Sequence, residues 1–474
     1  MGYLTGLVFF STTFSWLSSL AELFENPILL GLPLLLAGYL ALYPALWAWL
    51  VRHCPPESRT PAISSLKNVA FALKAAAAWV LLDWIRGWLF TGFSWNTPGV
   101  ALHQNLVLIQ IADLLGLHGV TFVLIFTNLA LALACRRVAR ARSIHAIPGV
   151  RIELMAVLLL ICGCISYGAR RLLHFRPGTL QLQTVCLQPN QPQRTLIDQN
   201  AEPVVFERLD QLMGLCATLS PSPDLILWPE AATHRGIYAD QENHEFLITQ
   251  AQRTSSALLI GSVEPHSFAE SDPIRLYNAA ILVTNQAKHF QSYRKRHLVP
   301  FGEFLPFREW MPSFVRDLIP GDIWPGQTAN LLHLQRPNRA PVQIGAVVCF
   351  EDSLSRETLD LARGGAQILV NLTNDAWFGS SVGSAQHLAN ARFRAVETRL
   401  PLLRCANTGV TCLVHPIGRI EQQLPPFETG LATHPVLFEE SPKPTPYVLL
   451  GDRWIWIGLL AALSLALRRP LQPH

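Results

Sequence analysis

Three short stretches of the sequence place a carboxylate, an amine and a thiol at the ends of apolar or β-rich runs. Glu230 ends ILWPE, Lys295 ends AKHFQSYRK, and Cys349 ends IGAVVC. A thiol, a carboxylate and an ammonium group can serve as nucleophile, base and positively charged helper in covalent catalysis. These residue types predict a nucleophilic active site, provided that the fold brings the three side chains together.

Two of these stretches also have an ordinary structural interpretation. Acids commonly end strands, so Glu230 alone is a weak signal. Lys295 has basic neighbours, whose repulsion favours a neutral amine, and it could belong to a solvated basic loop. The following run HLVPFGEFLP is apolar, aromatic and turn-rich, which favours a packed loop. Glu303 in that run is a second carboxylate, and its ordinary interpretation is an ion pair with Arg294 or Arg296.

Cys349 has neighbours that act against a reactive thiol. Burial and the nearby acids Glu351 and Asp352 disfavour a thiolate, and a lone buried cysteine is usually a small apolar residue. A strand end before a helix, however, lies close to helix N-terminal N–H groups, which lower a thiol pKa and can hold an oxyanion. If the fold brings the three residues together, Lys295 can supply a positive charge and Glu230 can serve as the base. Asp352 is expected to cap the next helix.

The composition indicates a membrane protein. Apolar residues make up 50% of the 474-residue chain and charged residues only 15%, against a usual charged share of about 25%. The mean hydropathy is +0.26. A net charge of +4 without a basic helical face argues against nucleic-acid binding. The nine cysteines form no CxxC pair and no zinc-type spacing, so no metal site is predicted.

Apolar stretches that approach the length needed to cross a bilayer crowd the first part of the chain, and one more lies near the C-terminus. The predicted spans are residues 2–20, 27–50, 69–90, 106–135, 154–167 and 454–467. The predicted domains are therefore membrane helices over 1–170 (about five spans), a soluble domain over 178–440 and a last span over 453–468.

Basic residues in the connections between spans predict the orientation in the membrane. They follow the second, fourth and last spans, whereas the connections 21–26 and 91–105 contain none. These residues are Arg52, Arg59, Lys67, Arg136, Arg137, Arg140, Arg142, Arg151, Arg468 and Arg469. Arg170, Arg171 and Arg176 are the exception, because they follow the fifth span on the other side, where we expect arginines that anchor the helix at the membrane surface. We therefore expect a cytoplasmic N-terminus and a soluble domain outside the cytoplasm. Asp83 and Arg86, one turn apart near the outer end of the third span, can pair on one helix face.

Short β-rich runs alternate with helical ones in the soluble part. Strands are expected over 180–188, 224–230, 257–263, 278–285, 287–295, 342–350, 366–374, 401–409 and 410–418, and helices over 201–219, 242–254, 354–363 and 385–399. Alternation of this kind predicts a layered α/β domain.

Several motifs are specific enough to resemble a known superfamily. WPE, YRKRHLVPFGE and VCFED are similar to the three catalytic segments of the nitrilase (carbon–nitrogen hydrolase) superfamily, whose fold is an α-β-β-α sandwich. LVPFGEFLP, residues 371–411 and RGWLFTGFSWNTPG resemble its membrane-embedded branch, the apolipoprotein N-acyltransferases. The resemblance covers nearly the whole chain. It implies a multi-span α-helical membrane domain and an α/β nitrilase-like domain.

The resemblance also implies roles for particular residues. It makes Glu230 the general base, Lys295 the charge stabiliser and Cys349 the nucleophile of a Glu-Lys-Cys triad. Phe350 stands where a tyrosine is often found, and the arm 191–199 lacks the tryptophan expected near the lipid site. The residues implied to lie near the active site are Glu303, Phe350, Glu351 and Asn278.

The implied activity is the last step of bacterial lipoprotein maturation. An acyl chain passes from a membrane phospholipid, expected to be phosphatidylethanolamine, through a cysteine thioester to the α-amine of a diacylglyceryl apolipoprotein. The resemblance implies no cofactor, no metal and no nucleic acid, and a monomer is expected. The catalytic domain would lie in the periplasm, anchored in the inner membrane.

Three alternatives stay open at this point. A membrane-anchored nitrilase-type amidohydrolase would share the triad but transfer the acyl group to water. A truncated, inactive family member is the second, because the family usually has eight spans and the sequence predicts six; the missing pair would precede Met1. A non-catalytic membrane scaffold would leave the triad dispensable.

Overall fold

The chain folds into two compact units in a computed structural model, which describes residues 1–53, 61–141, 150–233, 236–237, 240–267, 274–284, 290–316, 323–422 and 424–467. The helical unit comprises Met1–Ala21, Asn26–Phe175 and Thr445–His474, and the sheet unit comprises Glu22–Glu25 and Arg176–Pro444. Four of the basic residues that predict the orientation, Arg59, Arg142, Arg468 and Arg469, lie outside the described residues.

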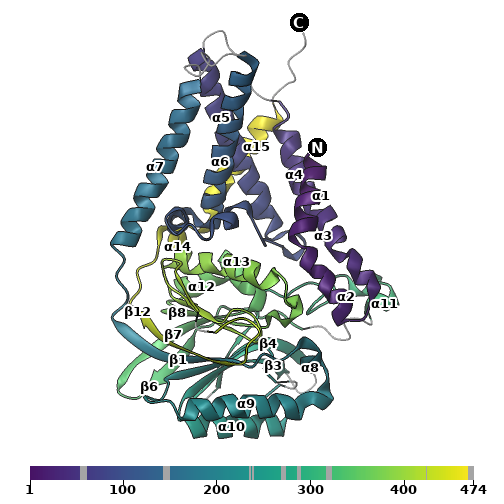
Figure 1. Cartoon of the computed structure of the whole chain (residues 1–474), viewed down its shortest axis with the longest axis vertical. Helices are drawn as coiled ribbons and strands as arrows, with labels where there is room; N and C mark the ends of the chain where they lie inside the picture. Colours follow the sequence, from purple (N-terminus) through teal and green to yellow (C-terminus); the bar gives the residue numbers. More distant parts are fainter. Residues whose placement is uncertain are drawn as a thin grey trace. The chain divides into compact units, whose positions relative to one another are not determined.

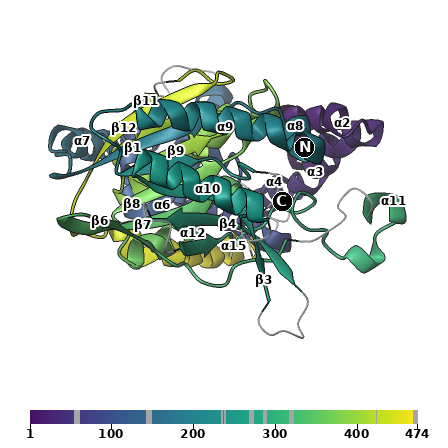
Figure 2. The ribbon, with the colours of Figure 1, turned by 90° about the horizontal axis from the view of Figure 1, so that it is seen from below.

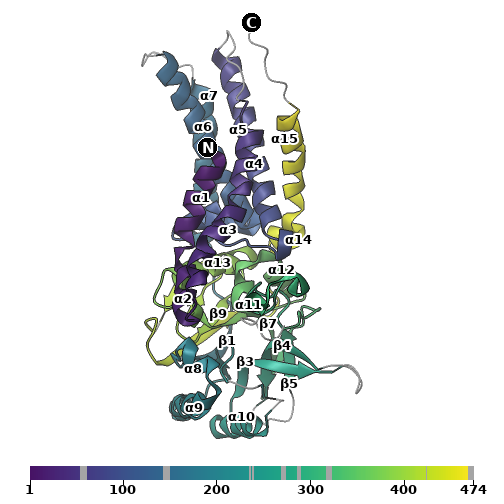
Figure 3. The ribbon, with the colours of Figure 1, turned by 90° about the vertical axis from the view of Figure 1, so that its right-hand side faces the viewer.

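Long apolar helices lie side by side within the helical unit (Figure 3). Among the described residues, five stretches are long and apolar enough to cross a membrane, and the bent pair Gly2–Thr13 and Ser15–Leu23 makes a sixth if it is one span. The predicted spans differ at their ends, since the fifth runs over Arg151–Leu173 and the last begins at Pro446. The α-helices of this part of the chain are α1 (Gly2–Thr13), α2 (Ser19–Leu23), α3 (Leu32–Leu40), α4 (Leu42–Leu50), α5 (Pro61–Arg86), α6 (Ala112–Ala141), α7 (Arg151–Leu173), α14 (Pro446–Leu450) and α15 (Ile457–Ala466).

Small side chains allow α5 and α15 to pack closely. The middle of α5 reads AFALKAAAA, and Ala75 and Ala76 are fully buried. At Gly458 on α15 an added Cβ would lie 2.6 Å from the carbonyl oxygen of Ala77. In lipid, apolar burial gives helices little reason to associate, so this close packing supplies the attraction between them.

Asp83 and Arg86 form the predicted ion pair on α5. Nη2 of Arg86 lies 2.7 Å from Oδ1 of Asp83, and both side chains are buried. Arg86 also donates to the carbonyl oxygens of Phe93 at 2.8 Å and Trp95 at 3.1 Å. The pair therefore holds the loop that follows α5, which is a structural role.

Two six-stranded mixed sheets form the sheet unit. Their strand orders are β12-β1-β2-β3-β4-β5 and β11-β10-β9-β8-β7-β6. The central strands β1-β2-β3 and β7-β8-β9 are parallel, and the outer pairs are antiparallel. The strands are β1 (Leu180–Gln188), β2 (Leu225–Trp228), β3 (Ala257–His266), β4 (Arg275–Val283), β5 (Phe290–Arg294), β6 (Leu332–Arg336), β7 (Arg339–Val348), β8 (Ile368–Thr373), β9 (Leu402–Ala406), β10 (Cys412–Val414), β11 (Ile420–Gln422) and β12 (Gly430–Phe438).

Helices cover the outer faces of both sheets. α9 and α10 connect the parallel strands of the first sheet and lie on it, and α12 and α13 do the same for the second sheet (Figures 1 and 2). The predicted α-β-β-α sandwich is therefore confirmed. The helices of this unit are α8 (Gln193–Ile197), α9 (Glu202–Ala217), α10 (Gln241–Thr254), α11 (Ser313–Arg316), α12 (Ser355–Arg363) and α13 (Gly383–Thr398).

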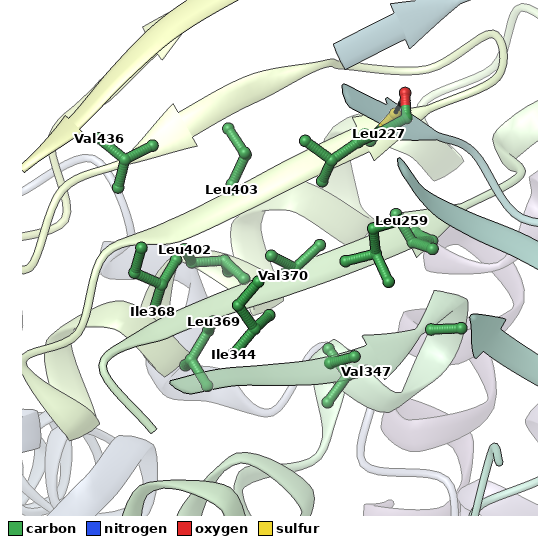
Figure 4. Packing of buried hydrophobic residues seen from close by; sticks show 14 of the residues in the cluster. Leu227, Leu259, Ile344, Val347, Ile368, Leu369, Val370, Leu402, Leu403 and Val436 are labelled. Atoms are coloured by element: carbon green, nitrogen blue, oxygen red, sulfur yellow. Dashed lines mark hydrogen bonds between the residues drawn. The ribbon is translucent and has the colours of Figure 1, made fainter. Parts of the chain in front are cut away.

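An apolar core fills the space between the two sheets (Figure 4). Leu227 and Leu259 come from the first sheet, and Ile344, Val370 and Leu402 come from the second. β2 and β8 are buried along their whole length, because each has helices on one side and the other sheet on the other. Burying one such side chain contributes about 1.5–3 kcal/mol. This core fixes the strand ends from which polar side chains project.

Candidate active site

Glu230, Lys295 and Cys349 come together where three strands end. Glu230 follows β2, Lys295 follows β5 and Cys349 follows β7. Nζ of Lys295 lies 3.6 Å from Oε1 of Glu230, and the charges of both residues act on the Cys349 thiol. All three residues are buried, and only 1% of the Lys295 surface is exposed.

Hydrogen bonds orient both oxygens of Glu230. Oε1 accepts from Nδ2 of Asn278 at 2.8 Å, and Oε2 accepts from the backbone N–H of Asn374 at 3.0 Å. Gly261 on β3 makes room for this residue, since an added Cβ would lie 2.4 Å from the Cα of Glu230. A carboxylate held in this way beside a thiol can accept its proton.

Lys295 is an ammonium group between two carboxylates. Its Nζ lies 2.8 Å from Oε2 of Glu303, which also accepts from the backbone N–H of Val299 at 2.9 Å. Oε1 of Glu303 accepts from Asn278 at 2.7 Å. Burial acts to lower the pKa of Lys295, but Glu303 and Glu230 outweigh it and raise the pKa above its usual value. The expectation that basic neighbours favour a neutral amine is therefore wrong.

The alternative partners of Glu303 are engaged elsewhere. Nη2 of Arg294 lies 2.6 Å from Oε1 of Glu264, and Nη2 of Arg296 lies 2.7 Å from Oδ2 of Asp360. The interpretation of Glu303 as a partner of Arg294 or Arg296 is therefore wrong.

Cys349 begins a short 3₁₀ helix, η9 (Cys349–Ser353), and its own backbone is left-handed with a φ of +51°. Burial, followed by the charge of Glu230, raises the pKa of the thiol well above its usual value. Lys295 and the hydroxyl of Thr373 act in the opposite direction and are outweighed. The expected lowering of the thiol pKa at this strand end is therefore wrong, so activation of the resting thiol needs a base.

Glu351 ties the segment that follows Lys295 to the segment that precedes Cys349. Its carboxylate is fully buried, and burial, followed by the charge of Glu357, raises its pKa. Glu351 therefore positions the two segments that carry Lys295 and Cys349, and it does so by accepting hydrogen bonds from both. The donors to its two oxygens are the Tyr293 hydroxyl (3.0 Å) and the backbone N–H groups of Arg296 (2.7 Å), His297 (3.0 Å) and Val348 (2.8 Å).

Replacing Glu351 with glutamine should destabilise the sheet unit. An amide NH₂ group would face backbone N–H donors, and each buried donor left without an acceptor costs about 1–3 kcal/mol. Thermal unfolding of the purified chain measures the loss. Glu439→Gln, at an exposed position, is the control and should leave the midpoint unchanged. Equal midpoints for the two variants would contradict the role of Glu351.

Phe350 and Asp352 lie on the same turn as Cys349. Phe350 is buried and its ring stacks on that of His297, with 5.7 Å between centroids. Asp352 does not cap the next helix, because α12 begins at Ser355 and has Leu354 at its N-cap without a side-chain bond. Instead, Asp352 is fully buried, and its Oδ1 lies 2.8 Å from Nε2 of His387.

Residues to which the sequence assigned no individual role complete the surroundings of Cys349. The backbone N–H of Asn374 orients Glu230. Asp375 and His387 belong to a fully buried group of charged side chains next to Cys349. For Asn374 and Asp375 the sequence cue is that they directly follow the buried strand β8, whereas His387 lies on α13 and has no such cue. Within the described part of the chain, no group of three or more His, Cys, Asp or Glu side chains is arranged to hold a metal ion.

Two family models match the chain. Residues 1–130 match the apolipoprotein N-acyltransferase N-terminal domain, and residues 205–440 match carbon-nitrogen hydrolase. An apolipoprotein N-acyltransferase of Geobacter metallireducens is 31% identical over 485 residues, which cover 100% of this chain and 88% of the relative. Another, of Methylococcus capsulatus, is 34% identical over 474 residues, covering 98% and 85%.

Solved structures of the nitrilase superfamily also match. Nit3 of Saccharomyces cerevisiae, a member of branch 10 of that superfamily, is 15% identical with a TM-score of 0.41, over 56% of this chain and 92% of that one.

Proposed function

This chain belongs to the apolipoprotein N-acyltransferase family, and we propose that Glu230, Lys295 and Cys349 carry out its acyl transfer. The activity is that of an acyltransferase in lipoprotein maturation. The observation that best supports these roles is the buried Lys295 ammonium, 3.6 Å from the Glu230 carboxylate and beside a thiol whose pKa both charges influence.

The first half-reaction forms an acyl-enzyme. Glu230 takes the proton of the Cys349 thiol while the sulfur attacks the carbonyl carbon of a phospholipid acyl ester. Lys295 and nearby backbone N–H groups stabilise the oxyanion. The ester C–O bond then breaks, Glu230 returns the proton to the leaving lysophospholipid oxygen, and a thioester remains on Cys349.

The second half-reaction uses the amine of the acceptor. The α-amine of a diacylglyceryl-cysteine attacks the thioester carbonyl, and Glu230 takes one of its protons. The C–S bond breaks, the proton returns to the sulfur, and the N-acylated lipoprotein leaves. Glu303 balances the charge of Lys295 throughout, and Asn278 orients both carboxylates.

We propose the bacterial inner membrane as the location, with the sheet unit in the periplasm. The long apolar helices support membrane insertion, and the basic connections after the second and fourth spans support this orientation. Arg137 is weaker support for this orientation than the other basic residues, because its charge is paired with the buried Glu153 at 3.0 Å. We also propose that the chain works as a monomer.

The proposed activity is tested with two lipid-bearing substrates. The purified chain is incubated with phosphatidylethanolamine carrying labelled acyl chains and a diacylated lipopeptide with a free α-amine. We expect transfer of one labelled chain to the lipopeptide, measured by mass spectrometry. The same lipopeptide with an acetylated α-amine is the control and should gain nothing. Release of labelled fatty acid without N-acylation would instead identify a hydrolase.

A further inference from the structure

The backbone at Cys349 is held in an unfavourable conformation. A residue with a side chain rarely adopts the left-handed φ of +51° found here, so surrounding contacts must maintain it. The carbonyl oxygen of Cys349 accepts from Nδ2 of Asn371 and from Nε2 of His387, each at 3.3 Å. These two side chains therefore fix the turn from which the sulfur projects.

His387 lies between two carboxylates. Its Nε2 lies 2.8 Å from Oδ1 of Asp352, and its Nδ1 lies 2.9 Å from Oδ1 of Asp375. Nη2 of Arg404 lies 3.1 Å from both oxygens of Asp375, and Nε of Arg404 lies 3.4 Å from Oδ2 of Asp352. These four side chains, which we call the buried charge cluster, are all fully buried. With a charged imidazole, its two positive and two negative charges balance.

The two carboxylates beside His387 favour the protonated form of its imidazole. Burial acts to lower its pKa and Arg404 acts in the same direction, but Asp352 and Asp375 outweigh them and raise the pKa to about 9. Nδ1 of the ring lies within hydrogen-bonding distance of Asp375 and 2.7 Å from Nη2 of Arg404. Nε2 lies near both Asp352 and the Cys349 carbonyl oxygen.

Thr373 connects the buried charge cluster to the sulfur of Cys349. The hydroxyl of Thr373 lies 3.2 Å from Oδ1 of Asp375, and the same hydroxyl interacts with the side chain of Cys349. Two independent contacts thus join the cluster to Cys349, one at its carbonyl oxygen and one at its sulfur. Buried ion pairs can often be replaced by apolar side chains without loss of stability, so stability alone does not explain four such charges.

We propose that the buried charge cluster positions the nucleophile: His387, held between Asp352 and Asp375, fixes the carbonyl of Cys349 and so aims its sulfur toward Lys295 and Glu230. The proposal rests on the proposed role of Cys349 as the acyl carrier. His387 is thereby a positioning residue, because it acts through Cys349 and not on the substrate.

Two variants test this role. His387→Gln removes the cation, and Asp352→Asn combined with His387→Gln removes one charge of each sign, which leaves the cluster balanced and favours folding. The matched control is His434→Gln, because His434 on β12 is equally buried and its Nδ1 lies 3.6 Å from Oε1 of Glu421, a residue outside the buried charge cluster. Single-turnover formation of the Cys349 thioester from labelled phospholipid is measured, together with KM for the phospholipid and thermal unfolding.

The rate of thioester formation should fall about tenfold to a hundredfold in both variants, as expected for a misplaced reacting group. KM should stay within about twofold of the parent, and His434→Gln should react like the parent. A balanced variant that folds and forms the thioester at the parental rate would overturn the proposal. Failure of both variants to fold would also overturn it, by assigning the cluster to stability alone. A parent chain that forms no thioester would instead refute the proposed role of Cys349.

Discussion

Replacing Cys349 with alanine should abolish both the thioester and the N-acylated product. The side chain is small and buried, so its removal leaves the charges of Glu230 and Lys295 paired at 3.6 Å and the sheet unit folded. No acyl carrier would remain at the site, and the activity should fall below detection. Intact-mass measurement after incubation with labelled phospholipid reports the thioester, and the lipopeptide assay reports the product.

Cys216→Ala is the matched control for this experiment. Cys216 is a buried cysteine on α9, and its variant should form the thioester and the product at the parental rate. Full N-acylation by the Cys349 variant would show that the acyl group passes directly from phospholipid to amine, which contradicts the proposed mechanism.

Replacing Lys295 with methionine should reduce acyl transfer by about 10²–10³-fold, the usual effect of losing one oxyanion donor. Methionine keeps much of the length of the side chain but leaves Glu230 and Glu303 without their shared cation. Breaking a buried ion pair by removing one partner costs about 3–5 kcal/mol, so the unfolding temperature should fall as well. The rate of thioester formation and the thermal midpoint measure the two effects.

A second variant separates catalysis from folding. Lys295→Met combined with Glu303→Gln removes one of the two carboxylate charges that lost their cation, so part of the stability should return. The rate should stay low, because the oxyanion still lacks its cation. If the rate recovers together with the thermal midpoint, Lys295 serves the fold and not the reaction.

The β-rich runs of the soluble half could be predicted because most of these strands are buried on both faces. β1 occupies the predicted residues 180–188, and β2 lies within 224–230. β12 was not predicted, although its inward residues alternate along THPVLF. Its partner β1 lies about 250 residues earlier in the chain, and a single sequence contains no signal that links segments so far apart.

The partner of Glu303 shows where local reasoning fails. Arg294 and Arg296 are the sequence neighbours of Lys295, and basic charge in that run is easy to see. Successive side chains at a strand end point to opposite sides, so only Lys295 turns toward the interior. The same reasoning missed His387, which meets Cys349 only because α13 packs beside the turn that contains it.

The pairing of the first and last strands of the sheet unit has a consequence for modularity. Leu180 at the start of β1 pairs with Phe438 at the end of β12, so the polypeptide enters and leaves the sandwich at one point. An inserted domain whose two ends lie close together can take the place of a short loop. It leaves the two flanking segments of the host chain close to each other, so it constrains the host fold as little as that loop would. The helices before Phe175 and those after Thr445 can therefore belong to one compact unit, although the whole sandwich separates them in the sequence.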